Sequence, residues 1–283
     1  MAGREEPGKG RLRAIRTLHT RKGRERQGRT LIEGVRLVEA ALEAGVQPEM
    51  ALCTARLLQT ERGRKLWSAL QGSGCGFWEV GEATLAELAT TETPQGVLAV
   101  IRLPVTPAAA LLTQEHPFLL VVDGVQDPGN LGTMLRTAAA AGATGALLGR
   151  GTVEPGNPKV LRAAMGAAFT LPLAVEADLP AALRVLGGRG VAVLAGDLAG
   201  ESNLFELDVG PPAAVVVGSE AHGLSPEVKA AVARRVRIPM APGVESLNAA
   251  VAAALLLYEV ARPVHRHSLV QPGPSALPGG GTL

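Results

Sequence analysis

The second half of the chain alternates short apolar runs with longer stretches in which apolar residues recur at helical spacing. A short apolar run predicts a buried strand, and apolar side chains three and four positions apart predict one face of a helix. Regular alternation of the two indicates an α/β fold, a parallel sheet with helices on both faces. We expect strands at residues 118–122, 145–148, 191–195, 213–217 and 236–238, and helices at 131–141, 160–168, 226–233 and 249–262.

The first half shows a shorter version of the same alternation. Leu31, Val35, Val38 and Leu42 are spaced as one face of an amphipathic helix over residues 30–44. Further strands and helices predict a smaller α/β domain over residues 30–103. Those strands are expected at 50–53, 76–80 and 97–101, and the helices at 61–70 and 82–88.

Proline and glycine mark the borders of these domains. Residues 104–117 contain three prolines and are predicted to be a linker to the larger domain, residues 118–262. The segment 263–283 is rich in Pro and Gly and is predicted to be a disordered tail, because it has too little apolar surface to bury.

Positive charge is concentrated at the N-terminus. Residues 1–36 hold eleven Lys and Arg against four Glu, a net charge of +7, whereas the whole chain carries +2, which leaves −5 for the remainder. Such a segment is typical of proteins that contact phosphate-rich partners, and a solvated tail has the same composition. It contains no aromatic residue, so it is suited to the nucleic-acid backbone rather than to base stacking. We predict a flexible basic arm over residues 1–29.

The amino-acid composition narrows the classes of protein to which the chain can belong. Hydrophobic residues make up 47% of the chain and aromatic residues 2%, so the core consists of Ala, Val and Leu, as in buried parallel strands. The longest uncharged apolar stretch, residues 246–258, is too short to cross a bilayer, and no membrane partner is expected. Cys53 and Cys75 form neither a disulfide nor a zinc pattern, and the N-terminus does not read as an export signal. This predicts reduced thiols, a cytoplasmic location and no bound metal.

Three polar phrases follow apolar runs of the larger domain: DGVQDPGNLGTMLRTA at 123–138, VVVGSEAHGL at 215–224 and IPMAPGVESLNAAVA at 238–252. Turns after parallel strands form the ligand crevice of an α/β sheet. GxGxxG, GxxxxGK[ST] and GxSxG are all missing, which argues against nicotinamide, P-loop and serine hydrolase chemistry. Asn130 has a structural explanation as a helix cap, whereas Arg136 in an Ala-rich helix is expected to have a partner such as a phosphate or an oxyanion.

Together the three phrases resemble the signature motifs of the SpoU (TrmH) family of RNA ribose 2′-O-methyltransferases, in the SPOUT superfamily. IEGVRLVEAAL at 32–42 and TPQGVLAV at 93–100 carry a weaker likeness to the L30e-like RNA-binding domain of the ribosomal members. The resemblance implies a deep C-terminal trefoil knot, S-adenosyl-L-methionine as cofactor, and a homodimer. It also implies that the substrate is RNA and not DNA, with 23S ribosomal RNA as the leading candidate.

The resemblance also implies the residues of the site. Family mechanisms make Arg136 the group that activates the ribose hydroxyl. A guanidinium is hardly ever neutral, so we expect a protonated Arg136 to clamp the adjacent phosphate and stabilise the forming alkoxide, with Glu220 orienting Arg136 or the ribose. The implied catalytic residues are Arg136, Asn130, Glu220, Ser246 and Asn248, and the implied cofactor contacts are Gly218, Ile238, Leu247, Met240 and Ala195.

Other functions stay open at this point. A thiopeptide-resistance rRNA methylase and a tRNA 2′-O-methyltransferase share the architecture. A catalytically inactive RNA-binding or ribosome-assembly protein would keep the fold and lose the polar residues, yet Arg136, Asn130 and Asn248 are all present. The identity of the modified nucleotide is not readable from these motifs.

Overall fold

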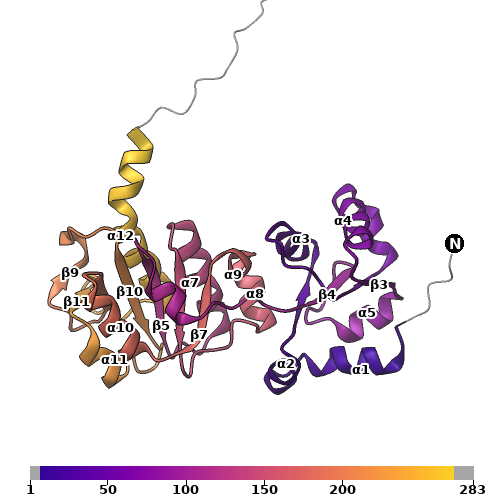
Figure 1. The fold of residues 1–283 in the computed structure, drawn as a ribbon, viewed down its shortest axis with the longest axis horizontal. Coiled ribbons are helices and arrows are strands. Elements are labelled where there is room, and N and C mark those ends of the chain that lie inside the picture. The colour runs from indigo at the N-terminus through magenta and orange to yellow at the C-terminus, as the bar shows by residue number, and fades with distance from the viewer. Residues whose placement is uncertain (1–6, 271–283) are drawn as a thin grey trace, which may run out of the picture.

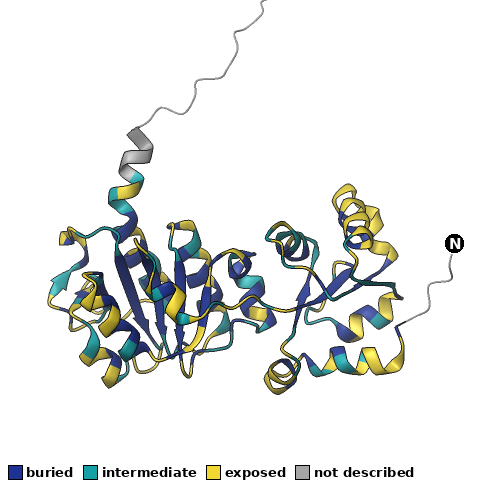
Figure 2. Cartoon of the chain, viewed as in Figure 1, coloured by how far each residue is buried: buried dark blue, intermediate teal, exposed yellow. Residues whose placement is uncertain are grey.

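The computed structural model of the protein describes residues 7–270. Each half of the chain builds its own sheet, and the two sheets lie along the long axis of the molecule (Figure 1). The interiors of both halves are buried and their helices expose one side to solvent (Figure 2). Among the described residues, no helix is both long and apolar enough to cross a bilayer.

The smaller sheet is mixed. β4 lies between β1 and β2 and is antiparallel to both, while β3 pairs with β2 in parallel. Its strands are β1 (Thr30–Glu33), β2 (Met50–Cys53), β3 (Gly76–Glu79) and β4 (Val97–Ile101), and its later helices are α3 (Val35–Glu43), the 3₁₀ helix η1 (Ala55–Gln59), α4 (Glu61–Gly72) and α5 (Glu82–Leu88).

The helix predicted over residues 30–44 is wrong in its first turn, because residues 30–33 form β1 and pair with β4. Gly34 follows with φ of 93°, a left-handed conformation that glycine adopts without steric cost, and it turns the chain from β1 into α3. The predicted apolar face survives in α3, where Leu37, Val38 and Ala41 are buried.

The flexible arm predicted over residues 1–29 is wrong for the part that the structure describes. This part forms two helices, α1 (Lys9–Thr17) and α2 (Arg21–Gln27). Ile15 and Leu18, each 1% exposed, pack in one apolar cluster with α5. The many Lys and Arg residues of the segment describe only its exposed, basic side. The segment folds because these two apolar side chains are buried.

The larger sheet has seven strands in the order β7-β6-β5-β10-β8-β11-β9. Every neighbouring pair is parallel, which confirms the predicted parallel α/β sheet. The strands are β5 (Phe118–Asp123), β6 (Gly145–Gly149), β7 (Leu173–Ala177), β8 (Ala192–Gly196), β9 (Ser202–Asn203), β10 (Ala213–Gly218) and β11 (Arg234–Arg237).

Helices cover both faces of this sheet, because successive strand residues point to opposite sides. In β5, Leu119 and Val121 join the apolar cluster of α6, α10 and α11, whereas Leu120 and Val122 join that of α7, α8, α9 and α12. The helices are α6 (Ala108–Leu112), α7 (Pro128–Ala140), α8 (Pro158–Ala164), α9 (Ala167–Thr170), α10 (Leu179–Gly188), α11 (Pro226–Ala231) and α12 (Ala249–Val270), with a short 3₁₀ helix η2 (Leu204–Glu206).

Several predicted boundaries differ from the structure. The linker 104–117 contains α6, whose Leu111 is buried, and the prediction omitted β7 and α10. The predicted helix 160–168 is divided into α8 and α9 at Met165, which has a φ of 49°. The disordered tail is wrong for residues 263–270, which continue α12 past Pro263, and residues 271–283 lie outside the described part.

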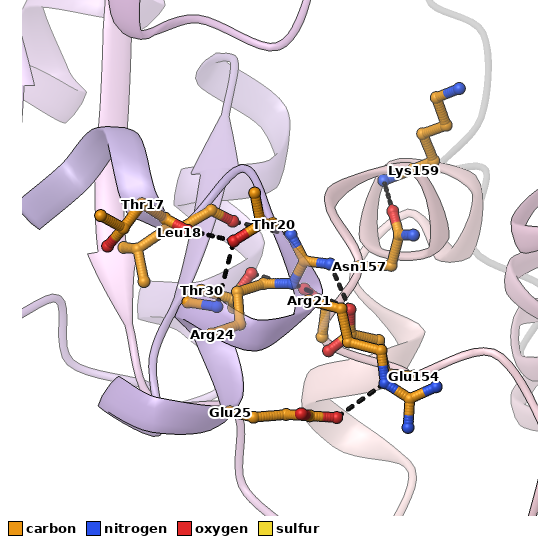
Figure 3. A network of polar contacts seen from close by, with 12 residues as sticks. Thr17, Leu18, Thr20, Arg21, Arg24, Glu25, Thr30, Glu154, Asn157 and Lys159 are labelled. Atoms are coloured by element: carbon orange, nitrogen blue, oxygen red, sulfur yellow. Dashed lines mark hydrogen bonds and ion pairs between the residues drawn. The ribbon is translucent and has the colours of Figure 1, made fainter.

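Polar contacts join the two domains where α2 and β1 meet the loop between β6 and α8 (Figure 3). Arg24, 6% exposed, donates from Nε to Glu154 Oε1 at 3.0 Å and from Nη1 to the Leu18 carbonyl at 2.7 Å. Thr30 Oγ1 donates to the Gly156 carbonyl at 2.5 Å. A buried guanidinium with a fixed carboxylate partner therefore sets how the smaller domain sits on the larger one.

Candidate active site

Three turns meet at one edge of the larger sheet. β5 and β10 are parallel neighbours with Asp123 and Gly218 in register, so the turns after both strands leave the same edge. Asp123 Oδ2 accepts a hydrogen bond from the Ser225 amide at 2.7 Å, which ties these turns together. The third turn, residues 238–248, leads into α12, which packs against both β10 and α7. The three polar phrases of the sequence therefore converge here.

A chain of side-chain hydrogen bonds connects the three turns. Asn248 Nδ2 donates to Asn130 Oδ1 at 2.9 Å, and Asn130 Nδ2 donates to Glu220 Oε1 at 2.8 Å. Glu220 also accepts from the backbone amides of Gln126 and Asp127, at 3.1 and 3.3 Å. Each of the three phrases thus contributes one member of a single polar network.

The direction of this chain follows from its ends. Asn248 Oδ1 accepts from the amide of Ala250 at 2.9 Å in the first turn of α12, so only its Nδ2 is left to donate to Asn130. A carboxylate at the other end only accepts, so Asn130 presents its amide nitrogen to Glu220. The network therefore admits one arrangement of both amide groups.

The cap of α7 is not the residue that we expected from the sequence. Asp127 Oδ1 accepts from the Asn130 amide at 2.8 Å, which makes Asp127 the N-cap. The side chain of Asn130 is consequently free to bridge Glu220 and Asn248. The structural explanation offered for Asn130 therefore applies to Asp127 instead.

Glu220 is held in its ionised form. Burial by itself would raise the pKa of its carboxyl group, but the hydrogen bonds from the Asn130 side chain and from the backbone amides of Gln126 and Asp127 outweigh burial and lower the pKa below the ordinary value of a glutamate. The carboxylate that the network needs is therefore lost only as the pH falls through this lowered pKa.

Beside this network lies a cavity of about 630 Å³, bordered by the ends of β8 and β10, the turn 219–224 and the segment 238–249. A volume of this order accommodates a cofactor-sized ligand. Ala195 is buried and is not part of the cavity lining, whereas its neighbour Gly196 is. The implied site residues in the lining are Gly218, Glu220, Ile238, Met240, Ser246, Leu247 and Asn248.

Gly218 has a steric reason to be glycine. A Cβ atom there would lie 2.2 Å from the backbone carbon of Gly223, because the turn after β10 folds back over the strand end. The Ser219 and Gly223 backbones pair across this turn, at 2.9 and 3.0 Å. Any side chain at Gly218 would therefore push the turn, and the wall of the cavity that it forms, out of place.

Comparison with known families agrees with this geometry. Residues 117–258, half of the chain, match the SpoU rRNA methylase family, and residues 9–99 match an MRM3-like substrate binding domain. The chain belongs to the SpoU rRNA methylase family. The second match begins at the start of α1, so the substrate-binding domain of this family member includes the two helices that replace the expected arm.

Relatives match over both domains. The 23S rRNA (guanosine(2553)-2′-O)-methyltransferase RlmP of Bacillus subtilis is 36% identical over 86% of this chain and 92% of its own. The mouse mitochondrial rRNA methyltransferase 3 is 34% identical over 89% of this chain and 72% of its own. A crystal structure of an AdoMet-bound rRNA methyltransferase from Sinorhizobium meliloti is 31% identical, with a TM-score of 0.79, and covers 90% of this chain and 95% of that one.

Arg136 lies apart from the network and the cavity. It is exposed on the outer side of α7, in the same stripe as Gly129, Thr133 and Ala140. Among the residues that the structure describes it has no hydrogen bond or ion pair, so the partner expected from the sequence is not found in this part of the chain.

Sequence reasoning missed two acidic residues of the cavity lining, Asp197 and Glu245. Asp197 follows β8 and lines the cavity, with Lys229 at 2.8 Å and Arg235 at 3.5 Å from its Oδ2. Burial would raise its pKa, but Lys229, the Ala199 amide and Arg235 lower it. The sequence held a signal for Asp197. Gly196-Asp197 follows an apolar strand, and the same two residue types in reverse order, Asp123-Gly124, stand at the end of β5.

Proposed function

We propose that the protein transfers a methyl group from S-adenosyl-L-methionine to a ribose 2′-hydroxyl of ribosomal RNA. The observation that carries this proposal is the cavity of about 630 Å³ joined to the Asn248–Asn130–Glu220 chain of hydrogen bonds. The Bacillus subtilis relative is named for this reaction on 23S rRNA, and the Sinorhizobium meliloti neighbour binds AdoMet.

The lining of the cavity suits this cofactor. Ile238, Met240 and Leu247 supply apolar surface for a flat ring, and the turn after Gly218 supplies backbone groups for its polar edge. S-adenosylmethionine would contribute a methyl group on a sulfonium, which is electrophilic without help from the protein. The residues of this chain then have to bind the cofactor, orient the ribose and stabilise the oxygen that attacks.

The polar residues divide this work. Asn130 and Glu220 hold each other rigidly at the mouth of the α7 turn, so a ribose placed against them meets donors and acceptors of fixed direction. Ser246 lines the cavity and completes its polar rim. A protonated Arg136 would stabilise the charge on the ribose oxygen, and the proton would leave through the adjacent phosphate or water.

The alternative functions are supported by fewer observations. An inactive RNA-binding or assembly protein has no need for the Asn248–Asn130–Glu220 chain of hydrogen bonds. Both the Bacillus subtilis and the mouse relative are named rRNA methyltransferases and match across both domains, which favours ribosomal RNA over tRNA. A resistance role would use the same residues, so housekeeping and resistance are not distinguished by the site.

The proposed cofactor gives a direct test. Isothermal titration calorimetry of the full chain should detect one site per chain for S-adenosylmethionine or its demethylated product, without added metal. Gly218→Leu should abolish this binding, because its side chain displaces the turn 219–223. Gly187→Ala, where nothing lies within 4 Å of the added methyl group, is the matched control. Undetectable binding to the unsubstituted protein would contradict the proposal.

Glu220→Gln should slow methyl transfer at every pH between about 5 and 9, with no change in the shape of the pH profile. The reason is that Glu220 is ionised throughout this range, since its pKa is lowered, and glutamine presents an amide group to three donors. Initial rates across the pH range measure it. The assignment would be contradicted if the pH profile of the unsubstituted enzyme showed an ionisation in this range and the profile of Glu220→Gln did not.

We also propose a homodimer in which the outer faces of α7 and α12 are covered by a second copy. α12 buries one side against β10 and α7, yet Val251, Leu255 and Tyr258 remain 49%, 37% and 48% exposed on the other. These side chains are spaced four and three positions apart, so they form one apolar stripe. A partner subunit on this stripe would also bring an Arg136, exposed on α7, into a shared site.

Light scattering at micromolar concentration should therefore give twice the 29.1 kDa of one chain. Leu255→Glu with Tyr258→Glu should yield monomers, because four charges would be buried at the two-fold contact. Val264→Glu, exposed further along α12, is the control. A monomer that methylates RNA at the full rate would contradict the dimer as the working form.

The remaining expectations belong to the same proposal. We place the knot in the passage of residues 238–248 between β11 and α12, and we take the smaller domain as L30e-like. A cytoplasmic setting is compatible with Cys53 and Cys75, which are both free thiols. RNA, rather than DNA or a membrane, is the proposed partner.

A further inference from the structure

A second large hollow lies between the two domains, away from the cavity described above. Its volume is about 680 Å³, and its walls come from the start of α3, from η1 and α4, and from the end of α8. Four arginines from these elements line it: Arg36, Arg56, Arg62 and Arg162. Three of them belong to the substrate-binding domain and Arg162 belongs to the methylase domain, so the hollow spans the junction.

The one acidic residue in this lining is not available to neutralise the arginines. Glu33 is 7% exposed, and its Oε2 accepts from the amide and the hydroxyl of Thr90 at 2.7 and 2.8 Å. Its Oε1 accepts from the hydroxyl of Thr91. Arg162 Nη1 donates to the Thr90 hydroxyl at 2.6 Å, so a polar chain crosses between the domains and joins two residues of the lining, Glu33 and Arg162.

The arginines of the rim differ in their partners. Arg62 pairs with Glu39 at 2.5 Å. Arg36 and Arg56 are exposed and, within the described part of the chain, have neither a hydrogen bond nor an ion pair. Their charges and that of Arg162 repel one another in a concave site, where low-dielectric walls strengthen the field. An anionic ligand in the hollow would remove this repulsion.

We propose that this hollow binds the sugar-phosphate backbone of the RNA substrate, with phosphates at Arg36, Arg56 and Arg162. The inference rests on the proposed function for the identity of the RNA. Planar guanidinium groups bind phosphate oxygens in pairs, and the lining holds no aromatic side chain for base stacking, so the site recognises backbone rather than sequence. A strand bound here touches both domains at once and fixes the RNA relative to the methylase domain.

The test compares the full-length protein with Arg36→Ala/Arg56→Ala and with Arg184→Ala/Arg234→Ala, two exposed arginines on α10 and β11 outside the hollow. The probe is transcribed 23S rRNA, and its affinity is measured over a series of KCl concentrations. Two lost phosphate contacts should reduce the slope of log affinity against log salt by about 1.4 to 1.8 units, whereas the control pair should leave it unchanged. The KM for RNA should rise with little change in kcat, and S-adenosylmethionine affinity should stay the same.

An unchanged slope, or an equal loss in the control pair, would overturn the proposal. So would unchanged RNA binding combined with weakened binding of poly-glutamate, a result that would assign the hollow to an acidic protein segment. If the proposed methyltransferase function were wrong, the experiment would give a different result. In that case the unsubstituted protein would bind rRNA without methylating it, and the salt slopes of the two variants would still decide whether the hollow holds RNA.

Discussion

Arg136→Ala is expected to reduce methyl transfer by at least about a hundredfold, the effect of removing one preorganised charge stabiliser. The guanidinium lies on the exposed side of α7 and has no hydrogen bond or ion pair within the described part of the chain, so its removal should leave the fold and the cofactor cavity intact. Single-turnover rates at saturating RNA measure the loss, and calorimetry should show little change in cofactor affinity.

Two further variants make this result specific. Arg136→Lys should recover only part of the rate, because an ammonium group cannot form two parallel hydrogen bonds to a phosphate. Thr133→Ala, one turn earlier on the same exposed stripe, should leave the rate close to that of the unsubstituted enzyme. Near-normal turnover in Arg136→Ala would remove this residue from the mechanism.

Glu154→Ala is expected to lower the free energy of unfolding by about 3–5 kcal/mol, because it leaves the guanidinium of Arg24 buried without its carboxylate. Arg24 is 6% exposed and reaches Glu154 through both Nε and Nη2, as Figure 3 shows. Urea denaturation of the full chain measures the change. The exposed pair of Arg21 and Glu25 gives the control, since Arg21→Ala should cost less than about 1 kcal/mol.

The double variant Arg24→Met/Glu154→Met tests the cause. Replacing both partners with apolar side chains of similar length removes the unpaired charge, so much of the lost stability should return. An effect as large in the double variant as in Glu154→Ala would show that packing, rather than the uncompensated charge, is responsible.

Glu154→Ala should also slow methyl transfer, because Glu154 belongs to the loop that supports the α7 turn. In this loop the Val153 amide donates to the Val125 carbonyl at 2.8 Å, and Thr152 Oγ1 accepts from the Gly124 amide at 3.1 Å. Two residues after Gly124, the backbone amide of Gln126 donates a hydrogen bond to Glu220. A disturbance at the domain contact therefore has a short path of hydrogen bonds to the active-site network.

Local pattern predicted much of the fold. β2, β4 and α5 have the bounds that their apolar spacing indicated, and each strand of the larger sheet that was predicted is present. The prediction was wrong where burial depended on a distant element. α1 packs on the domain because Ile15 and Leu18 reach the helix α5, more than sixty positions away, and the many charged residues around them mask that apolar pair in any local window.

The polar residues of the site were also readable in sequence, since each follows an apolar strand within a short phrase. Their hydrogen bonds were not, because Asn130 meets Glu220 and Asn248 across 90 and 118 positions of chain. The same holds for Arg24 with Glu154 and for the arginines of the interdomain hollow.

The sequence by itself therefore determined the parallel sheet, the three polar turns and the residue types available for chemistry, because periodicity and turn residues act over a few positions. Tertiary structure decided which side chains meet. It placed Gly196 rather than Ala195 in the lining of the cavity, joined Asn130 to Glu220 and Asn248, and left Arg136 on an open face. These outcomes depend on contacts between segments far apart in the chain, whose distances only the packing of the two sheets and their helices sets.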